Sequence, residues 1–377
     1  MTKCEAPACL SRPNGVAGEL HIWILNFLLE TMIQNSFMRP LIIPVFLSFA
    51  DCRQKCLFCN PKATAAGGPD PSSLRRFVDR SLQQIPSRHQ DREKQVAFYG
   101  GSFTAMDPED QISYLKKVHP FLVAGRIDSI RISTRPDALS DEILLLLQEH
   151  GVKTVEVGVQ SMIDDVLLLS NRGHSAADTV SAISRLKQWH FEVGVQLMIG
   201  LPGDTMDRFL HTLDLITPLH PDFLRIHPTL VLRGAPLEIL WRLGHYIPLS
   251  LDEAIQWLKK GLLTLEKASV PVARIGLQPT RELQDHTVAG PYHPSLNQLV
   301  RSAIAFDMAS HLLHLSGKQP HALFLCHPKE TSVVRGQRNG NILKLMDQFG
   351  LNEIFLQASE DVPRETLVLQ TSNGERS

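Results

Sequence analysis

Most of the first 230 residues alternate short apolar runs with helical patterns. Six runs rich in β-branched residues lie at about 42–49, 95–99, 128–133, 153–159, 192–199 and 222–227, and turn residues and an amphipathic helical pattern follow each run. Strands that alternate with helices pair in parallel and are covered by those helices. The sequence therefore predicts an α/β fold, a partial (β/α)6 barrel of the TIM type that is open on one side.

Each of the six runs ends in residues that a strand does not need. The carboxyl ends of barrel strands meet at one rim, where β/α barrels assemble their active sites. We therefore expect the end segments to form a single site. They are 52–59, 100–104, 133–137, 160–161, 200–204 and 227–229.

The first of these segments carries Cys52, Cys56 and Cys59 at C-x3-C-x2-C spacing. Three thiolates on one loop can hold an iron–sulfur cluster and leave one iron open for chemistry. A structural zinc site is the alternative, with its fourth ligand from elsewhere in the chain, for example from Cys326 and His327. Disulfides are the weaker alternative, because six cysteines in 377 residues are sparse and no export signal is evident. Reduced thiols in the cytoplasm are the expectation.

Charge and hydropathy exclude some partner classes. The chain has 38 basic and 39 acidic residues, so no global field attracts nucleic acid or anionic lipid. Any RNA contact would be local. Arg335, Arg338 and Lys344 form one basic cluster that suits a phosphate backbone, although three such charges are more often only a solvated surface. The apolar run at 21–29 is far shorter than a membrane span, so no membrane partner is expected.

The pattern changes at two points along the chain. Residues 1–37, with one apolar helix-like stretch, differ from the rest of the chain, and we expect a poorly ordered extension or a segment that precedes a true start at Met38. The barrel is expected over 38–234. A mixed α+β extension is expected over 235–377, with a long helix at 250–269.

The cysteine spacing, with Phe58 directly before the last cysteine, resembles that of radical S-adenosylmethionine (SAM) enzymes. The sequence GGSFT at 100–104 resembles the Elp3-like branch of that superfamily, and 198–205 is similar to its glycine-rich turn after the fifth strand. The resemblance implies a [4Fe–4S] cluster on Cys52, Cys56 and Cys59. It also implies SAM on the open iron, cleavage of SAM to a 5′-deoxyadenosyl radical, and a one-electron reductant of the flavodoxin or ferredoxin type.

The resemblance also assigns contacts to SAM. The backbone of a motif that usually reads Gly-Gly-Glu receives the amino group, and a serine replaces the glutamate here. Arg172 suits the methionyl carboxylate, because guanidinium binds carboxylate in a fork and stays charged when buried. Gln196 stands where several relatives have an acidic ribose ligand. The implied contacts are Phe58, Gly100, Gly101, Ser102, Ser133, Gln160, Arg172, Gln196 and Gly203.

The reaction is less constrained than the family. Oxygen-independent coproporphyrinogen oxidases share the cysteine spacing but carry a further cysteine, where this chain has Asn60 and Pro61. Elp3 itself has a longer spacing and a following acetyltransferase domain. RNA modification is our leading hypothesis; tetrapyrrole chemistry and a non-catalytic zinc- or RNA-binding barrel are the alternatives. Glu156 is expected either to touch substrate in the barrel or to be a structural carboxylate.

Overall fold

The computed structural model describes residues 20–26, 40–47, 56–60, 63 and 68–372. Contacts divide the chain into two units, Leu28–Ile304 and a second unit made of Met1–Phe27 with Ala305–Ser377. Cys4, Cys9 and Cys52 lie outside the described residues. No helix among the described residues is long and apolar enough to cross a membrane.

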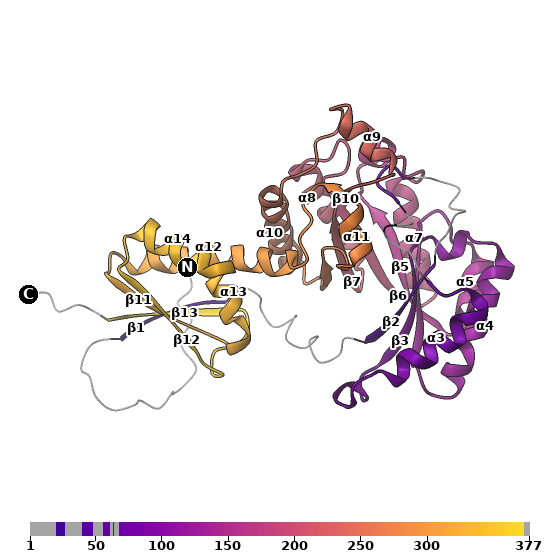
Figure 1. Cartoon of the computed structure of the whole chain (residues 1–377), viewed down its shortest axis with the longest axis horizontal. Helices are drawn as coiled ribbons and strands as arrows, with labels where there is room; N and C mark the ends of the chain where they lie inside the picture. The colour runs from indigo at the N-terminus through magenta and orange to yellow at the C-terminus, as the bar shows by residue number, and fades with distance from the viewer. Residues whose placement is uncertain (1–19, 27–39, 48–55, 61–62, 64–67, 373–377) are drawn as a thin grey trace, which may run out of the picture. The chain divides into compact units, whose positions relative to one another are not determined.

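The first unit is built on a curled sheet of seven parallel strands (Figure 1). Its order is β2-β3-β4-β5-β6-β7-β9, so each strand lies beside the next one along the chain, apart from the short β8. The predicted partial barrel is confirmed, with a seventh strand from the region expected to be the extension. The strands are β2 (Leu41–Phe46), β3 (Lys94–Tyr99), β4 (Ser129–Thr134), β5 (Val152–Gln160), β6 (Glu192–Ile199), β7 (Phe223–Pro228) and β9 (Val272–Ile275).

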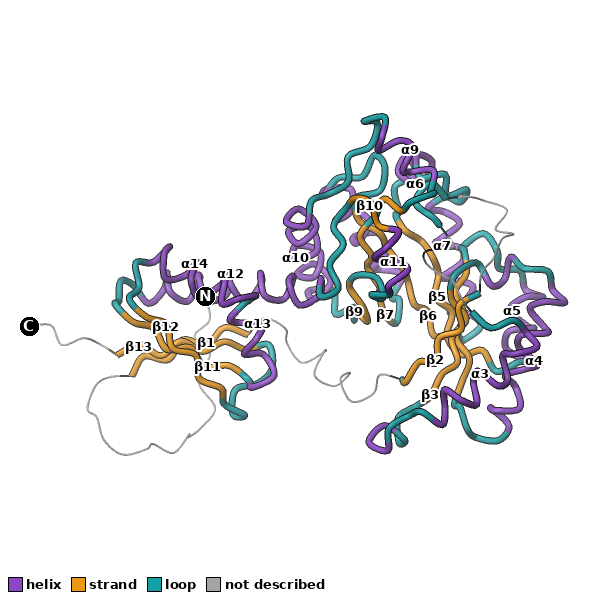
Figure 2. The backbone as a smooth tube through the Cα atoms, in the orientation of Figure 1, coloured by secondary structure: helices purple, strands orange, loops and turns teal. Residues whose placement is uncertain are grey.

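Helices cover the outer face of this sheet (Figure 2). That face carries fully buried aliphatic and aromatic side chains such as Val96, Phe98 and Ile130, and their removal from water holds the helices in place. Ser175 and Asp178 start α7 with a reciprocal capping box. The helices of this unit, which include short ones near the strand ends, are α3 (Pro71–Gln83), α4 (Pro108–Val123), α5 (Asp141–Glu149), α6 (Asp164–Leu169), α7 (Ala176–Gln188), α8 (Met206–Ile216), α9 (Pro236–Arg242), α10 (Leu251–Lys267) and α11 (Arg281–His286).

Short elements complete this unit. The strands β8 (Val231–Leu232) and β10 (Thr287–Ala289) pair antiparallel in a sheet of their own. Three 3-10 helices, η1 (Ser87–His89), η2 (Phe103–Ala105) and η3 (Thr217–Leu219), lie in connections. Residues 235–304 group by contacts with the barrel, whereas the sequence placed them in the extension.

The second unit is a four-stranded mixed sheet in the order β1-β13-β11-β12. The strands β11 and β12 are parallel, and β13 is antiparallel to both of its neighbours. Phe324, Cys326 and Leu345 lie in its core. The elements are β1 (Leu20–Asn26), α12 (Leu296–Ser316, which begins in the first unit), β11 (His321–Cys326), η4 (Pro328–Glu330), α13 (Thr331–Arg335), η5 (Gln337–Asn339), α14 (Gly340–Phe349), β12 (Glu353–Ala358) and β13 (Thr366–Ser372).

The apolar stretch near the N-terminus differs from its expectation. Leu20–Asn26 is a strand, with Ile24 opposite Val368 of β13, although the sequence suggested a helix-like stretch in a poorly ordered extension. A short apolar run fits either element, and here β13 supplies the backbone hydrogen bonds that decide for a strand. The pairing partner lies more than 300 residues away along the chain, so local pattern gives no sign of it.

Candidate functional site

The described part of the cysteine loop is held by backbone hydrogen bonds to two helical segments. Cys56 is buried, with 6% of its surface exposed, and Cys59 is partly exposed. Leu57 N–H donates to Ser170 O (3.1 Å) just after α6, and Leu57 O accepts from Leu237 N–H (2.8 Å) in α9. The third predicted ligand, Cys52, lies outside the described residues.

Arg172 contacts this loop directly, across 116 residues of sequence. Its Nη1 lies 3.2 Å from Cys56 Sγ, and its Nη2 donates to Gly158 O. A Cβ atom at Gly158 would lie 2.9 Å from Nη2, so a larger residue would displace the guanidinium. Arg172 is 7% exposed, and its Nε–H is buried without an acceptor among the described residues. A buried unsatisfied N–H is costly, and a carboxylate would satisfy it.

The turn after β3 is joined to the end of β4. Gly100 has φ of +102°, a conformation that glycine adopts at little cost. Ser102 is buried, and its Oγ lies 3.0 Å from Thr134 Oγ1 and accepts from Arg135 N–H (3.2 Å). Thr104 Oγ1 also contacts Thr134 Oγ1. The serine that replaces the usual glutamate therefore fixes the position of this turn.

Three of the predicted polar contacts lie on adjacent strands at the same rim. Ser133 of β4 lies opposite Glu156 of β5, two residues before Gly158. Gln196 Nε2 of β6 is 3.5 Å from Gln160 Oε1 at the end of β5. The sheet thus places Gln160 and Gln196 side by side and Ser133 on the neighbouring strand β4, and the contacts of all three with SAM stay a prediction.

Apolar side chains form another part of the rim. Phe58 packs against Val166, Met198 and Leu201, and this cluster includes residues at the end of β6. Gly203 lies in the turn that follows β6. The structure therefore places Phe58 and the glycine-rich turn on the same side of the strand ends.

The glycine-rich turn is stabilised by Asp204, which the sequence reasoning placed at the rim without a role, and by Tyr246, which it missed. Asp204 accepts from Gly200 N–H and Thr205 N–H, both at 3.0 Å, and Tyr246 O–H donates to Gly200 O (2.6 Å). Burial raises the pKa of Asp204 to about 7. An aspartate four residues after a strand-ending glycine was the available signal for the first; Tyr246 gave none.

The inner face of the sheet carries a buried ionic network around Glu156. The carboxylate is 2% exposed and lies 2.8 Å from Arg131 Nη1 and 2.8 Å from Arg225 Nη1. Tyr99 O–H also donates to it (2.9 Å). Burial alone would raise the pKa of Glu156, but Arg225 and Arg131 hold that pKa below its ordinary value. Charged residues in the middle of two strand patterns, SIRIS and FLRIH, were the signal for both arginines.

Two histidines near the rim are neutral. His174 Nε2 lies 3.2 Å from Val159 O, and burial together with the charge of Arg172 lowers its pKa to about 4. Burial, Arg225 and Arg274 lower the pKa of His227 to about 3. In the second unit, burial raises the pKa of Cys326, which favours the thiol over the thiolate that a metal ligand requires.

Comparison with known proteins assigns the family. Residues 47–216 match the family model of the Radical SAM superfamily, and residues 221–305 match the Radical_SAM C-terminal domain. The chain belongs to the radical SAM superfamily. Radical SAM enzymes use a [4Fe–4S] cluster and SAM.

Individual relatives confirm the resemblance to the Elp3-like branch. The radical SAM chain is 28% identical over 254 residues to the tRNA uridine(34) acetyltransferase of Methanocaldococcus infernus, covering 57% of this chain and 48% of that relative. It is 26% identical over 219 residues to human Elongator complex protein 3, covering 50% and 40%. The structure of M. infernus Elp3 with an N-terminal deletion matches with a TM-score of 0.53 and 26% identity, covering 63% and 59%. The chain spans about half the length of the curated relatives it matches.

Proposed function

We propose that this protein holds a [4Fe–4S] cluster on Cys52, Cys56 and Cys59 and cleaves SAM reductively to act on an RNA substrate. The contact between Arg172 and Cys56 carries the proposal, because it joins a proposed cluster ligand to the residue proposed for the SAM carboxylate. When bound, the cluster and SAM supply a 5′-deoxyadenosyl radical that abstracts hydrogen, and the protein supplies orientation and exclusion of water.

We assign to the rim residues the roles that the resemblance to the family implies. The unsatisfied Nε–H of Arg172 suits one oxygen of the SAM carboxylate. In this proposal the backbone of Gly100, Gly101 and Ser102 receives the SAM amino group. Ser133, Gln160 and Gln196 supply the polar groups for the ribose and methionyl part, and Phe58 and Gly203 line the adenine side.

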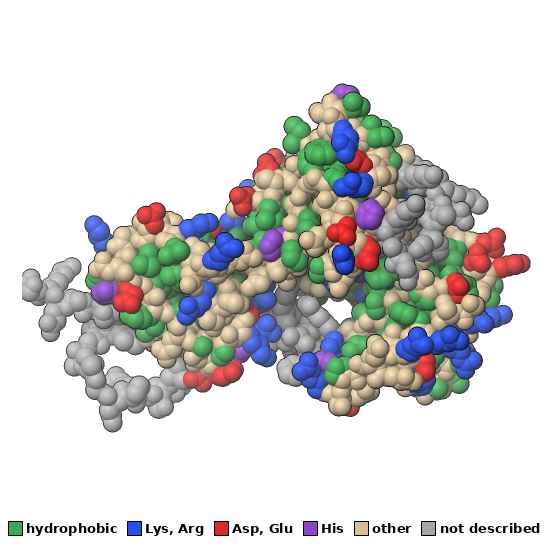
Figure 3. All heavy atoms as spheres, viewed as in Figure 1, with side chains coloured by type: hydrophobic (Ala, Val, Ile, Leu, Met, Phe, Trp, Pro, Cys, Tyr) green, Lys and Arg blue, Asp and Glu red, His purple; other side chains and the backbone are tan. Residues whose placement is uncertain are grey.

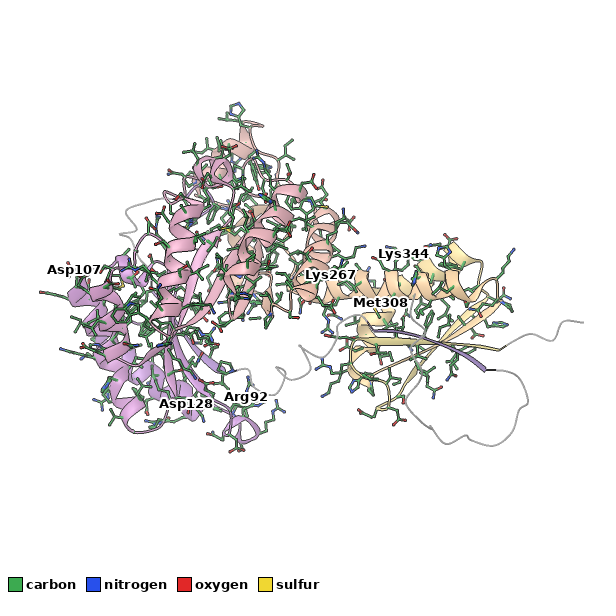
Figure 4. All side chains as sticks on the ribbon, turned by 180° about the vertical axis from the view of Figure 1, so that it is seen from behind. Arg92, Asp107, Asp128, Lys267, Met308 and Lys344 are labelled. Carbon is green, nitrogen blue, oxygen red and sulfur yellow. The ribbon has the colours of Figure 1, made fainter. Side chains whose placement is uncertain are left out.

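The RNA part of the proposal rests on two observations. The relatives named above are a tRNA uridine(34) acetyltransferase and an Elongator subunit. The basic cluster is exposed in the second unit: Arg335 ends α13, Arg338 lies in η5 and Lys344 projects from α14 (Figure 4). Basic and acidic side chains both occur over the face of the molecule shown in Figure 3. A local cluster of this kind can neutralise phosphates where the chain as a whole cannot.

A reductant and a location complete the proposal. The cluster needs one electron for each cleavage, and a flavodoxin or ferredoxin is the proposed donor. The cytoplasm is the proposed location, since its reducing conditions keep cluster thiols available.

The test is anaerobic reconstitution with iron and sulfide, followed by dithionite and SAM. We expect about four irons per chain and formation of 5′-deoxyadenosine. Cys52→Ala, Cys56→Ala and Cys59→Ala should each lose the iron, whereas Cys326→Ala, in the core of the second unit, should keep it. Bound zinc without 5′-deoxyadenosine would refute the proposal. Retention of transfer RNA by the full chain tests the substrate class separately.

A further inference from the structure

Two arginines on the inner face of the sheet lie level with the proposed SAM contacts. In the strand register Gln196 of β6 lies opposite Arg225 of β7, and Arg225 lies opposite Arg274 of β9. Residues paired in this way point to the same face of a sheet. Arg225 and Arg274 therefore continue the row that begins with Gln196, toward the far edge of the half-barrel.

Contacts across β6 show that this is the concave face. Arg225 on β7 reaches Glu156 on β5, passing over Gly194 of the intervening strand. A Cβ atom at Gly194 would lie 2.3 Å from the Phe223 ring and 3.1 Å from Glu156 Cγ. The glycine is thus the position that lets side chains of β5 and β7 meet inside the half-barrel.

Arg131, Arg225 and Arg274 on this face outnumber the carboxylate that pairs with two of them. Glu156 serves both Arg131 and Arg225. Arg274 donates to Gly276 O (3.1 Å) and Leu277 O (3.2 Å), and none of the described carboxylates forms an ion pair with it. Glu192, at the amino end of β6, accepts from Thr154 Oγ1 instead. Partly buried positive charge without a counter-charge is costly, and a bound anion removes that cost.

The same region offers a neutral donor and rigid support. His227 follows Arg225 by two residues on β7, so it shares the inner face, and its Nε2 is buried without a partner among the described residues. The Arg225 guanidinium lies 5.2 Å from the centroid of the Tyr99 ring, and Arg131 lies 4.9 Å from that of Phe223. Stacking on these rings restrains the guanidinium groups before any ligand arrives.

We propose that Arg225, Arg274 and His227 bind an anionic group of the substrate, a carboxylate or a phosphate, inside the half-barrel. This inference rests on the proposed function, since the bound group would present the substrate to the SAM site beside Gln196. Guanidinium groups recognise both anions through paired hydrogen bonds, and a neutral imidazole can donate one more.

The experiment is isothermal titration of the full chain, without SAM, with inorganic phosphate and with acetate at constant ionic strength. The wild type should bind at least one of the two anions. Arg274→Gln should weaken binding by about tenfold or more, the value of one lost charge-assisted hydrogen bond. The matched control is Arg76→Gln on the exposed surface of α3, which should bind as the wild type does. Arg274→Lys keeps the charge but not the fork, and should fall between wild type and Arg274→Gln.

The outcomes separate the sources of the anion and the two proposals. If phosphate binds more tightly than acetate, the result supports a phosphate-bearing substrate such as a nucleotide. If acetate binds more tightly, it supports a substrate that is a carboxylic acid. No binding to the wild type, equal weakening by Arg76→Gln, or weakening by Arg172→Gln but not by Arg274→Gln would each overturn the inference. Formation of 5′-deoxyadenosine by the reconstituted wild type tests the proposed function independently of anion binding.

Discussion

Replacing Glu156 by glutamine tests whether the ionic network stabilises the half-barrel. The change removes the charge of a carboxylate that is 2.8 Å from a guanidinium nitrogen on each side. Arg131, which is buried, and Arg225, which is partly buried, then remain without their counter-charge. Removing one partner of a buried ion pair costs about 3–5 kcal/mol. Glutamine keeps one acceptor oxygen, so we expect the free energy of unfolding to fall by about 3 kcal/mol, the lower end of that range.

Urea unfolding followed by tryptophan fluorescence measures this loss, because Trp189, Trp241 and Trp257 all lie in the first unit. The control Glu149→Gln, at the exposed end of α5, should change the free energy of unfolding by no more than about 0.5 kcal/mol. Adding Arg225→Gln to the Glu156 variant should cost less than the two single changes summed, with a coupling of about 0.5–3 kcal/mol.

The pH dependence of stability tests the same ionic network. The arginines hold the pKa of Glu156 below its ordinary value, so the network stabilises the fold at neutral pH. This contribution is lost as the pH falls below the ordinary pKa of a glutamate and through the lowered pKa of Glu156, where the carboxylate is protonated. The Glu156→Gln variant has no carboxylate to titrate at this position. The difference in free energy of unfolding between this variant and the wild type should therefore become smaller in acid. A decrease in the free energy of unfolding of less than about 1 kcal/mol at neutral pH would refute the reasoning, because ordinary substitutions have effects of that size.

Three further predictions concern the rim, the turn after β6 and the second unit. Cys56→Ala should abolish the visible absorbance of the reconstituted cluster, whereas Cys326→Ala should not; equal loss in both would exclude Cys56 as a specific ligand. Burial raises the pKa of Asp204 to about 7, so the wild type loses stability as the pH rises toward that value. The Asp204→Asn variant does not titrate at this position, so its melting temperature should rise relative to that of the wild type between about pH 5 and pH 8. A constant difference between the two melting temperatures across that range would contradict the raised pKa. The double change of Arg338 and Lys344 to alanine should weaken transfer RNA binding at low salt and reduce the slope of its salt dependence by about two; an unchanged slope would move the RNA contact elsewhere.

Local pattern was sufficient for the barrel strands and for the rim. Apolar runs of five to eight residues followed by helical periodicity predict parallel strands under helices, and the strands from β2 to β7 lie where the sequence placed them. The parallel pairing of β5 with β6 then brings Gln160 and Gln196 together. The cysteine spacing, together with the motifs at 100–104 and 198–205, indicated the superfamily, and the family comparison confirmed it.

The sheet that an element joins was not predictable in this way where its partner is distant. The four-residue β9 lies in the region that the sequence assigned to the extension, and it joins the barrel sheet through its register with β7. Leu20–Asn26 becomes a strand because β13 pairs with it. In both cases the backbone hydrogen bonds that place the element come from residues far along the chain.

The same distinction between local spacing and distant contacts applies to the chemistry of the site. The sequence by itself determined the family, the half-barrel and the strand ends at which polar residues gather, because each depends on spacing within a few residues. Only the tertiary structure decided that Arg172 contacts Cys56, that Glu156 lies between two arginines, and that Arg274 has no carboxylate partner among the described residues. A charged side chain is identified by the sequence, but its burial and its counter-charge are set by strands that meet only when the sheet forms.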